Sequence, residues 1–377
     1  MIEQLWVQNY RSLKDVRVAL GNLNVLVGLN GSGKSTLVDV LRFVSDALLL
    51  GLDAAIFKRQ GMRALRRWSA NKQAYDIEIG LSIRTDEFLA QYEFVLGRAS
   101  DRRDDYYVKR EACLIEKEGQ KSEFQSENGR WVKKPADIHP QIQTHALLLP
   151  LITGIPPFQD LYNFIKGMSF YHIWPAALRE PQKFVNPYPL ESDGRNLAAA
   201  LFELERREGN LRDALKAALN FVLFEVDDYQ IDLVGNHLVV KLHHQYAANG
   251  QSPWFEVTQV SDGTLRMLGI LIALYQDPPR TLIALEEPEL TVHPYIMVRL
   301  WDELVDASER SQIILTTHSP DLLDLCTVEQ LRVVEKVEGI TYVGLLDERQ
   351  SRLIQEERFA PGQVLKALGT LNRAIED

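Results

Sequence analysis

The chain has 377 residues, of which 46% are hydrophobic and 25% are charged, and its formal net charge is −10. This size and composition argue for one large or two ordinary globular domains and against a mainly disordered chain. The acidic balance argues against a protein that coats nucleic acid with its whole surface. The two cysteines, Cys113 and Cys326, are too few for a disulfide framework or a cysteine-rich zinc site.

The N-terminal residues, MIEQLWVQNYRSLKD, are too polar for a signal peptide. The longest apolar stretches, such as Met267 to Leu274, fall far short of the roughly 20 residues that span a bilayer. We therefore expect a soluble, cytoplasmic protein that makes no membrane contact.

The first predicted elements are two short strands, IEQLWVQ and VRVAL, on either side of the turn NYRSLKD. An apolar strand from Leu23 to Val27 follows, then a glycine-rich loop and a helix with an apolar face. The spacing from Gly28 through Gly33 to Lys34 and Ser35 fits the pattern G-x-x-x-x-G-K-[ST], which binds nucleotide phosphates where it joins a strand to a helix. Both flanking elements are present, which argues against a glycine-rich turn without a ligand.

This loop predicts how a nucleotide is held. Backbone N–H groups of the turn point at phosphate oxygens, and the helix N-terminus adds a partial positive charge. We expect Lys34 to reach the β- and γ-phosphates and the hydroxyl of Ser35 to bind Mg²⁺, which makes ATP and Mg²⁺ the expected cofactors. The residues predicted to contact the nucleotide here are Asn30, Gly31, Ser32, Gly33, Lys34, Ser35 and Thr36.

A basic stretch, Lys58 to Lys72, comes after the predicted helix and contains no acidic residue. Trp68 lies within it as a candidate stacking group. Two hypotheses are open for this stretch: a solvated loop or helix face, or a surface that contacts DNA or a partner protein. Its basic residues are Lys58, Arg59, Arg63, Arg66, Arg67 and Lys72.

The middle of the chain predicts a sheet, then helices, then a hairpin. Alternating β-type runs from Tyr75 to about Lys117 predict an added antiparallel sheet. A longer helical segment runs from Asn196 to about Leu223, and Gly235-Asn236 separates two strand-like runs. Because no heptad pattern is sustained, we expect residues 35–261 to be compact, without a long coiled-coil arm.

Four further segments arrive in order. They are a helix apolar on every side opened by Ser261 and Gly263, a strand that ends in Glu286 and Glu287, a strand that runs into His318, and a final strand pair, LRVVEKVEGITYVGLL. The first three are individually weak or moderate signals. Their order after a phosphate-binding loop is far more specific.

Each segment has a chemical interpretation. At the end of a parallel strand, Glu286 is expected on the metal side, and Glu287 is expected to act as the general base that orients or deprotonates water. His318, at the tip of the neighbouring strand, is expected to sense the γ-phosphate. Ser261 and the backbone of Gly263 form a second expected anion-binding surface at a helix start.

Together these residues resemble the ATP-binding-cassette (ABC) ATPase superfamily, and specifically the soluble heads of RecF, structural-maintenance-of-chromosomes (SMC) and overcoming-lysogenization-defect (OLD) proteins. VSDGT stands at the place of the signature loop, LIALEEPEL resembles the Walker B strand, and TTHSP resembles the switch-histidine segment. NYRSL resembles the N-terminal turn that places a basic residue, here Arg11, near the nucleotide. The implied fold is α/β, a P-loop NTPase of ABC type with a mixed or parallel central sheet, an added antiparallel β-lobe and a helical lobe.

The resemblance implies one ATPase head over residues 1–345 and a C-terminal tail over 346–377. Within the head we expect a lobe with the phosphate-binding loop and the antiparallel sheet at about 1–175. A helical and signature region is expected at about 176–275, and the Walker B and switch-histidine core at about 276–345.

The resemblance also implies a mechanism in which two heads sandwich two ATP molecules. Ser261 of one head then completes the γ-phosphate site of the other, so that ATP holds a homodimer or a higher oligomer together and hydrolysis loosens it. We expect an ATPase of this kind to control a separate nuclease or toxin effector in bacterial anti-phage defence.

This sequence departs from the pattern in three ways. Glu286 replaces the usual aspartate, which affects the Mg²⁺ geometry and the hydrolysis rate. The Q-loop glutamine is not identifiable, since Gln141, Gln143 and Gln159 are all candidates for it. The 59 residues after His318 are too few for a TOPRIM nuclease domain.

Three alternatives to effector control are open. The first is a RecF-like DNA repair or recombination clamp that binds DNA directly through the basic stretch. The second is a nucleotide-dependent scaffold that hydrolyses slowly because of Glu286. The third is the energy module of a membrane transporter, which the divergent signature and the added antiparallel strands disfavour.

Overall fold

The computed structural model describes residues 1–68, 75–98, 105–135, 141–183, 189–206, 211–245, 253–356, 358–369 and 371–374. The chain forms two compact units. The first unit comprises Met1–Met168, Val328–Gln355 and Thr370–Asp377, and the second comprises Ser169–Thr327 and Glu356–Gly369. The lobe boundaries drawn from the sequence remain predictions, although the segment expected to be a tail contains two helices, Glu348–Gln355 and Pro361–Leu368.

The first unit is built on a mixed sheet whose strand order is β8-β7-β6-β5-β4-β1-β2-β17-β16-β3. Most neighbours are antiparallel, but β16 pairs in parallel with β3, and β17 in parallel with β2. The strands are β1 (Ile2–Tyr10), β2 (Leu13–Ala19), β3 (Leu23–Val27), β4 (Ile77–Arg84), β5 (Phe88–Gly97), β6 (Tyr107–Lys117), β7 (Gln120–Glu127), β8 (Arg130–Lys133), β16 (Leu331–Val337) and β17 (Ile340–Gly344). The helices are α1 (Lys34–Leu49), α2 (Leu52–Phe57), α3 (Met62–Leu65), α4 (Pro156–Lys166), α11 (Glu348–Gln355) and the 3-10 helices η1 (Leu149–Leu151) and η3 (Val328–Gln330).

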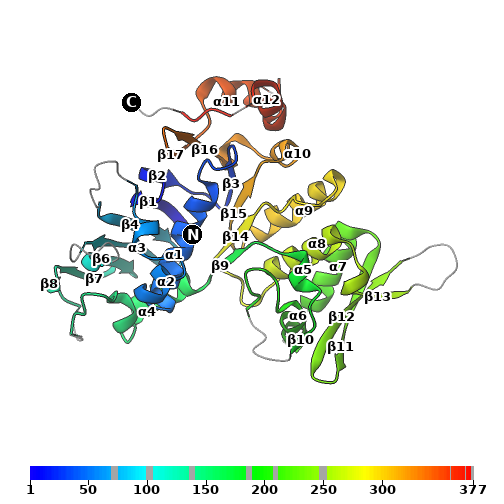
Figure 1. Ribbon diagram of the computed structural model, residues 1–377, viewed down its shortest axis with the longest axis horizontal. Coiled ribbons are helices and arrows are strands. Elements are labelled where there is room, and N and C mark those ends of the chain that lie inside the picture. The colour runs from blue at the N-terminus through cyan, green and yellow to red at the C-terminus, as the bar shows by residue number, and fades with distance from the viewer. Residues whose placement is uncertain are drawn as a thin grey trace. The chain divides into compact units, whose positions relative to one another are not determined.

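One face of this sheet carries the core of the first unit. Strand β5 buries every second residue from Phe88 to Phe94, as expected for a strand with one covered face. Phe94 meets Phe43 of α1 at a ring distance of 6.3 Å, and Phe124 of β7 meets Phe158 of α4 at 5.5 Å. Helices α1 and α4 therefore pack on the same face of the antiparallel strands (Figure 1). The antiparallel lobe predicted from Tyr75 to Lys117 is confirmed.

The second unit combines a short sheet, a hairpin and a helical cluster. Strands β15, β14 and β9 are neighbours in that order, and β14 and β15 are parallel. The strands are β9 (Met168–Tyr171), β10 (Gln182–Lys183), β11 (Val226–Val234), β12 (His237–His244), β13 (Trp254–Glu256), β14 (Leu282–Glu286) and β15 (Gln312–Thr317). The helices are α5 (Pro175–Leu178), α6 (Leu197–Arg206), α7 (Leu211–Leu223), η2 (Val257–Gln259), α8 (Asp262–Leu274), α9 (Pro294–Ala307), α10 (Pro320–Leu323) and α12 (Pro361–Leu368).

Helix α8 is the centre of the second unit. All of its residues from Leu265 to Leu274 are buried, because α5, α6, α7 and α9 pack around it (Figure 1). This confirms the prediction that a helix apolar on every side is buried. The hairpin β11–β12 turns at Gly235-Asn236 as predicted.

Helix lengths in the described part of the chain test two of the expectations. The longest helix there, α1, has 16 residues, and the segments between Ser35 and Ser261 that the structure describes contain no coiled-coil arm. Nor is any helix of the described residues long and apolar enough to cross a membrane.

Candidate functional site

The predicted site residues are divided between the two units. The glycine-rich loop, Lys34, Ser35 and Arg11 belong to the first unit, and Ser261, Glu286, Glu287 and His318 belong to the second.

The glycine-rich loop joins the buried strand β3 to helix α1, as the motif requires. Its shape depends on glycines at two places. A Cβ atom at position 28 would lie 2.0 Å from the backbone oxygen of Val334, and one at position 33 would lie 2.4 Å from the hydroxyl of Thr341. Gly33 also has a φ of 116°, which side chains with a Cβ rarely adopt. The loop therefore needs its glycines for close packing against β16 and β17.

Lys34 is buried at the first position of α1, and its ammonium group turns back into the loop. It donates hydrogen bonds to the carbonyl oxygens of Gly28 at 2.8 Å and Leu29 at 3.2 Å. Asn30, Gly31 and Ser35 are exposed, while Thr36 is half-buried. The loop thus places a buried lysine at the base of a turn whose residues Asn30, Gly31 and Ser35 are exposed.

Ser32 supplies the clearest sign that this loop is built for a ligand. Its hydroxyl oxygen is buried and has no hydrogen-bond partner among the residues that the structure describes. The carbonyl of the same residue is fixed, since it accepts a hydrogen bond from the Thr341 hydroxyl at 2.7 Å. A buried hydroxyl without a partner costs free energy, and a phosphate oxygen is an acceptor that relieves this cost. The loop residues therefore fit a nucleoside triphosphate.

Arg11 lies at the turn between β1 and β2 and has a φ of 49°. Its guanidinium pairs with Asp39 of α1 at 3.2 Å. The same carboxylate accepts a hydrogen bond from the Tyr10 hydroxyl at 2.7 Å and pairs with Arg59 at 2.8 Å. Burial, with a smaller contribution from Asp39, raises the pKa of Tyr10 well above its usual value. Asp39, which the sequence analysis missed, therefore anchors the basic turn to the helix that starts at Lys34.

Two residues of the basic stretch are used for internal packing, whereas Lys58 and Arg63 are exposed. Arg59 is buried and pairs with both Asp39 and Asp46 of α1. Arg66 is buried and donates a hydrogen bond to the carbonyl of Gly97 at 2.9 Å. The hypothesis of a solvated face is wrong for these two residues, because their partners draw them into the unit. Lys72 lies outside the described residues, and Trp68 is 80% exposed.

In the second unit, Ser261 is the N-cap of α8. Its exposed hydroxyl accepts a hydrogen bond from the backbone N–H of Thr264 at 3.2 Å. At Gly263 the chain passes so close to Thr291 that a Cβ atom would lie 2.7 Å from the carbonyl oxygen of that residue. The start of α8 thus combines a capped helix N-terminus with an exposed hydroxyl, a geometry that suits an anion.

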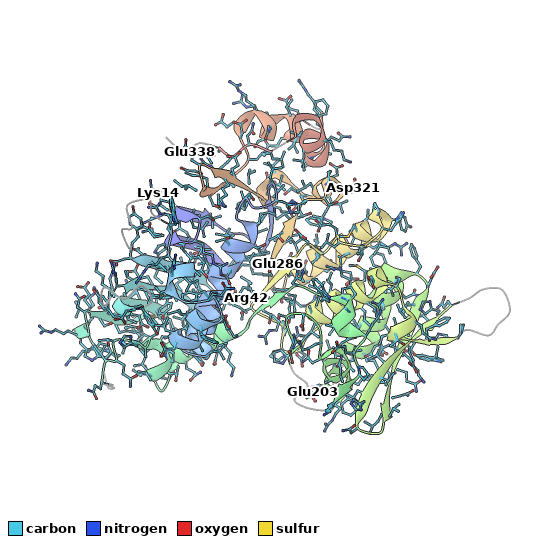
Figure 2. All side chains as sticks on the ribbon, viewed as in Figure 1. Lys14, Arg42, Glu203, Glu286, Asp321 and Glu338 are labelled. Carbon is cyan, nitrogen blue, oxygen red and sulfur yellow. The ribbon has the colours of Figure 1, made fainter. Side chains whose placement is uncertain are left out.

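Glu286 and Glu287 lie where β14 ends. Glu286 is the last residue of the strand and is the register partner of Thr316 in the parallel strand β15 (Figure 2). Glu287 follows with a φ of 46°, and its backbone N–H donates to the carbonyl oxygen of Thr316 at 3.0 Å. Residues other than glycine rarely hold such a positive φ, and these conformations cluster at functional sites. The chain therefore turns sharply at the end of β14, and Glu287 no longer continues along the strand.

The structure brings Glu287 and His318 together. The Nε2 atom of His318 lies 3.0 Å from Oε1 of Glu287, and both side chains are about one-third exposed. The two residues come from the ends of neighbouring parallel strands, as the sequence pattern predicted. A carboxylate paired with a histidine at this distance can orient water and exchange a proton with its surroundings.

Two further residues surround this pair and were not singled out from the sequence. The Oε1 atom of Glu289 accepts hydrogen bonds from the Thr317 hydroxyl at 2.6 Å and from the backbone N–H of His318 at 3.0 Å. Arg266 of α8 is buried and donates to the carbonyl oxygen of Glu287 at 3.4 Å. Burial lowers the pKa of Arg266, and Glu289 is the first of the acids that oppose this effect. The third acid of the EEPEL segment was the sequence signal for Glu289.

Residues 23–324 match the protein family described as "AAA domain, putative AbiEii toxin, Type IV TA system". The chain is 22% identical over 356 residues to the OLD nuclease of Thermus scotoductus, and this match covers 89% of the chain and 62% of the nuclease. The chain therefore spans less than two thirds of the length of that relative.

Solved structures with a similar fold are heads of SMC proteins. The Smc head domain with an extended coiled coil from Pyrococcus furiosus, bound to the C-terminal domain of ScpA, has a TM-score of 0.55 and 14% identity. That similarity covers 95% of this chain and 99% of the other. An SmcHead bound to the C-winged helix domain of ScpA has a TM-score of 0.50 and 17% identity, over 93% of this chain and 99% of the other. At these identities the likeness shows the fold alone.

The family match covers most of the chain, and it includes the phosphate-binding loop, the strand that ends in Glu286 and the strand that runs into His318. The mixed sheet with its antiparallel lobe and helical cluster is the fold that the sequence pattern predicted. The chain belongs to this AAA-domain family and has the P-loop NTPase fold of ABC type.

Proposed function

We propose that the protein binds and hydrolyses ATP with Mg²⁺, dimerises head to head around the nucleotide, and controls a separate nuclease or toxin effector in anti-phage defence. The observation that carries the proposal is the contact between Glu287 and His318 at 3.0 Å, in a chain whose glycine-rich loop presents Lys34.

The residues present have distinct tasks in hydrolysis. ATP supplies the phosphoryl group, and its Mg²⁺ neutralises charge on the phosphates. Lys34 exchanges its hydrogen bonds to loop carbonyls for phosphate oxygens. Ser35 and Glu286 would hold Mg²⁺, an oxygen set that this ion accepts together with phosphate and water. Glu287 takes a proton from the attacking water, and His318 donates to the γ-phosphate.

Dimerisation is proposed from the start of α8. Ser261 is exposed, and its hydroxyl oxygen accepts from the Thr264 N–H and lies 2.8 Å from the Thr264 hydroxyl, so a phosphate oxygen from outside the subunit could take its proton in place of that hydroxyl. A partner head that brings its ATP to this helix start would meet the hydroxyl and the backbone of Gly263. ATP would then lie between two subunits, and its hydrolysis would separate them.

The proposed effector is a separate nuclease or toxin. Support comes from the matched family, described as a "putative AbiEii toxin, Type IV TA system", and from the relative named an OLD nuclease. Direct binding of DNA through the basic stretch is the weaker version, since Arg59 and Arg66 are buried in ion-pair and backbone contacts.

The test is ATP-dependent dimerisation, measured by size-exclusion chromatography with light scattering. We expect the wild-type chain to form a dimer with ATP, and Ser261→Arg to bind ATP but stay monomeric. Asn236→Arg, which adds the same charge at the exposed turn of the β11–β12 hairpin, is the matched control and should dimerise. A Ser261→Arg variant that dimerises like the control would contradict the cross-subunit role.

The effector is tested separately. A complex purified with its partner should show nuclease or toxin activity that depends on ATP. Lys34→Ala in the same complex should remove that dependence. Effector activity that is the same without ATP and in the Lys34→Ala complex would refute control by the ATPase.

A further inference from the structure

Glu289 occupies a rigid position two residues after Glu287. Pro288, which lies between them and is buried, fixes its own φ and donates no backbone hydrogen bond. The backbone N–H of Leu290 closes the turn by donating to the carbonyl oxygen of Glu287 at 3.2 Å. The Arg266 guanidinium donates to the same oxygen. The spacing between the two carboxylates is therefore held by the chain itself.

The Glu289 carboxylate reaches the end of β15 and holds it through two donors. Oε1 accepts from the Thr317 hydroxyl at 2.6 Å and from the backbone N–H of His318 at 3.0 Å. Thr317 is fully buried, and its hydroxyl oxygen also accepts from the backbone N–H of Ser319 at 2.9 Å. Bonds to an ionised acceptor are stronger and shorter than neutral ones. Glu289 thus fixes the backbone from which the His318 imidazole projects.

The same acidic segment consequently supports both members of the Glu287–His318 pair. Glu287 belongs to it, and His318 is attached to it through Glu289. The second oxygen of Glu289, Oε2, is buried and lacks a hydrogen-bond partner in the described part of the chain. The Nε atom of Arg266 is buried and lacks one too, within the same described residues. A buried oxygen without a partner costs free energy, so this half of the carboxylate adds nothing to the stability of the fold.

We propose that Glu289 is a positioning residue of the ATPase, which sets the place of His318 by accepting hydrogen bonds from the backbone N–H of that residue and from the Thr317 hydroxyl. The proposal rests on the proposed function, in which His318 and Glu287 act on the terminal phosphate. It adds that turnover depends on an acid that touches neither the nucleotide nor the attacking water.

The experiment compares three substitutions in the full-length chain. Glu289→Leu has a similar size but no acceptor, so kcat should fall about 10- to 100-fold, the range expected when a reacting group is misplaced by about 1 Å. KM and the dissociation constant for ATP should change less than about twofold, because the phosphate-binding loop is untouched. Glu289→Gln keeps an oxygen that accepts both bonds and should retain most of the turnover. Glu309→Gln, at an exposed acid of the same unit, is the control and should match wild type.

Two results would overturn the proposal: wild-type kcat in Glu289→Leu, or a Glu289→Gln variant as slow as Glu289→Leu. If Glu289→Leu does not fold, Thr317→Val removes one donor and leaves the His318 N–H in place. It should lower kcat less than Glu289→Leu would, and unchanged turnover would count against the proposal.

A readout without hydrolysis separates this inference from the proposed function. The amide proton of His318 should resonate further upfield in Glu289→Leu than in the wild type, because its bond to a carboxylate is lost. An unmoved resonance overturns the positioning role even if the protein is an ATPase. A moved resonance in a protein without ATPase activity leaves the contact standing and refutes the proposed function instead.

Discussion

The phosphate-binding loop of the first unit and the Glu287–His318 group of the second unit are built in different ways. The loop is shaped by backbone: Gly28 and Gly33 pack against β16 and β17, and Lys34 donates to two carbonyl oxygens. The group in the second unit is shaped by side chains and includes a positive φ at Glu287. Its neighbours also hold buried polar atoms without partners among the described residues.

Buried carboxylates show the same contrast. Glu111 in β6 is fully buried, and both of its oxygens accept hydrogen bonds, from the backbone N–H groups of Leu148 and Leu149 and from Tyr92. Among the described residues, only the Oε1 atom of Glu289 accepts hydrogen bonds, and its Oε2 atom has no partner. Fully satisfied buried networks rigidify a structure, whereas a buried polar atom without a partner costs free energy. In the proposed function, binding therefore belongs to a loop that is fixed by backbone packing and leaves one hydroxyl, that of Ser32, for the ligand, whereas turnover belongs to a group of side chains around a positive φ.

The largest expected effect separates turnover from binding. Glu287→Gln removes the proposed base but keeps its shape, so kcat should fall roughly 10²- to 10⁴-fold while the dissociation constant for ATP stays within about twofold. Steady-state hydrolysis and calorimetric titration measure the two quantities. Glu309→Gln is the control. A loss of affinity equal to the loss of turnover would break the division between the two groups.

Lys34→Ala should do the opposite and act on binding. Two charge-assisted hydrogen bonds to phosphate at about 1.5–3 kcal/mol each imply a loss of affinity of at least about 100-fold. Calorimetric titration with ATP measures the loss. Lys14→Ala, at an exposed lysine of the same unit, should bind like the wild type. Micromolar affinity retained by Lys34→Ala would contradict the assignment of the loop as the phosphate site.

The contrast also explains which parts of the molecule the sequence could predict. The loop is encoded by contiguous residues whose spacing and flanking elements are visible in the chain, so its strand, turn and helix were predicted correctly. The antiparallel lobe and the strands that end in Glu286 and His318 were predicted by short-range alternation and apolar runs.

Contacts between distant residues could not be predicted. The Thr341 hydroxyl that braces the loop is 309 residues away from its partner, the carbonyl of Ser32. Arg59 and Arg66 belong to a stretch with no acidic neighbour in sequence, and only the placement of α1 brings Asp39 and Asp46 to Arg59. The bonds of Glu289 depend on the parallel register of β14 and β15.

The third prediction concerns the pH dependence of the rigid scaffold. Burial raises the pKa of Glu111 from 4.5 to about 7. Between these values the unfolded chain loses a proton that the folded chain keeps, so stability falls as pH rises and levels off above about pH 7. The contribution is on the order of 3 kcal/mol. Glu111→Gln should remove this part of the pH dependence in urea unfolding measured from pH 4.5 to 8.

The matched control for Glu111→Gln is Glu118→Gln, at the exposed turn between β6 and β7. It should keep the wild-type slope of stability against pH. Equal slopes of stability against pH in both variants would show that Glu111 ionises freely. The buried carboxyl group of the scaffold would then not keep its proton in the folded chain.

The smallest expected effect tests whether the loop is as rigid as its packing implies. Gly28→Ala places a Cβ atom 2.0 Å from the carbonyl oxygen of Val334, a backbone atom that cannot rotate away. Overpacking of this kind costs about 1–3 kcal/mol of unfolding free energy. Gly21→Ala, where nothing lies within 4 Å of the added atom, should be neutral. If both variants unfold at the same urea concentration, the loop adapts to the added methyl group. The phosphate-binding loop would then differ from the Glu287–His318 group in the chemical groups it presents, and not in rigidity.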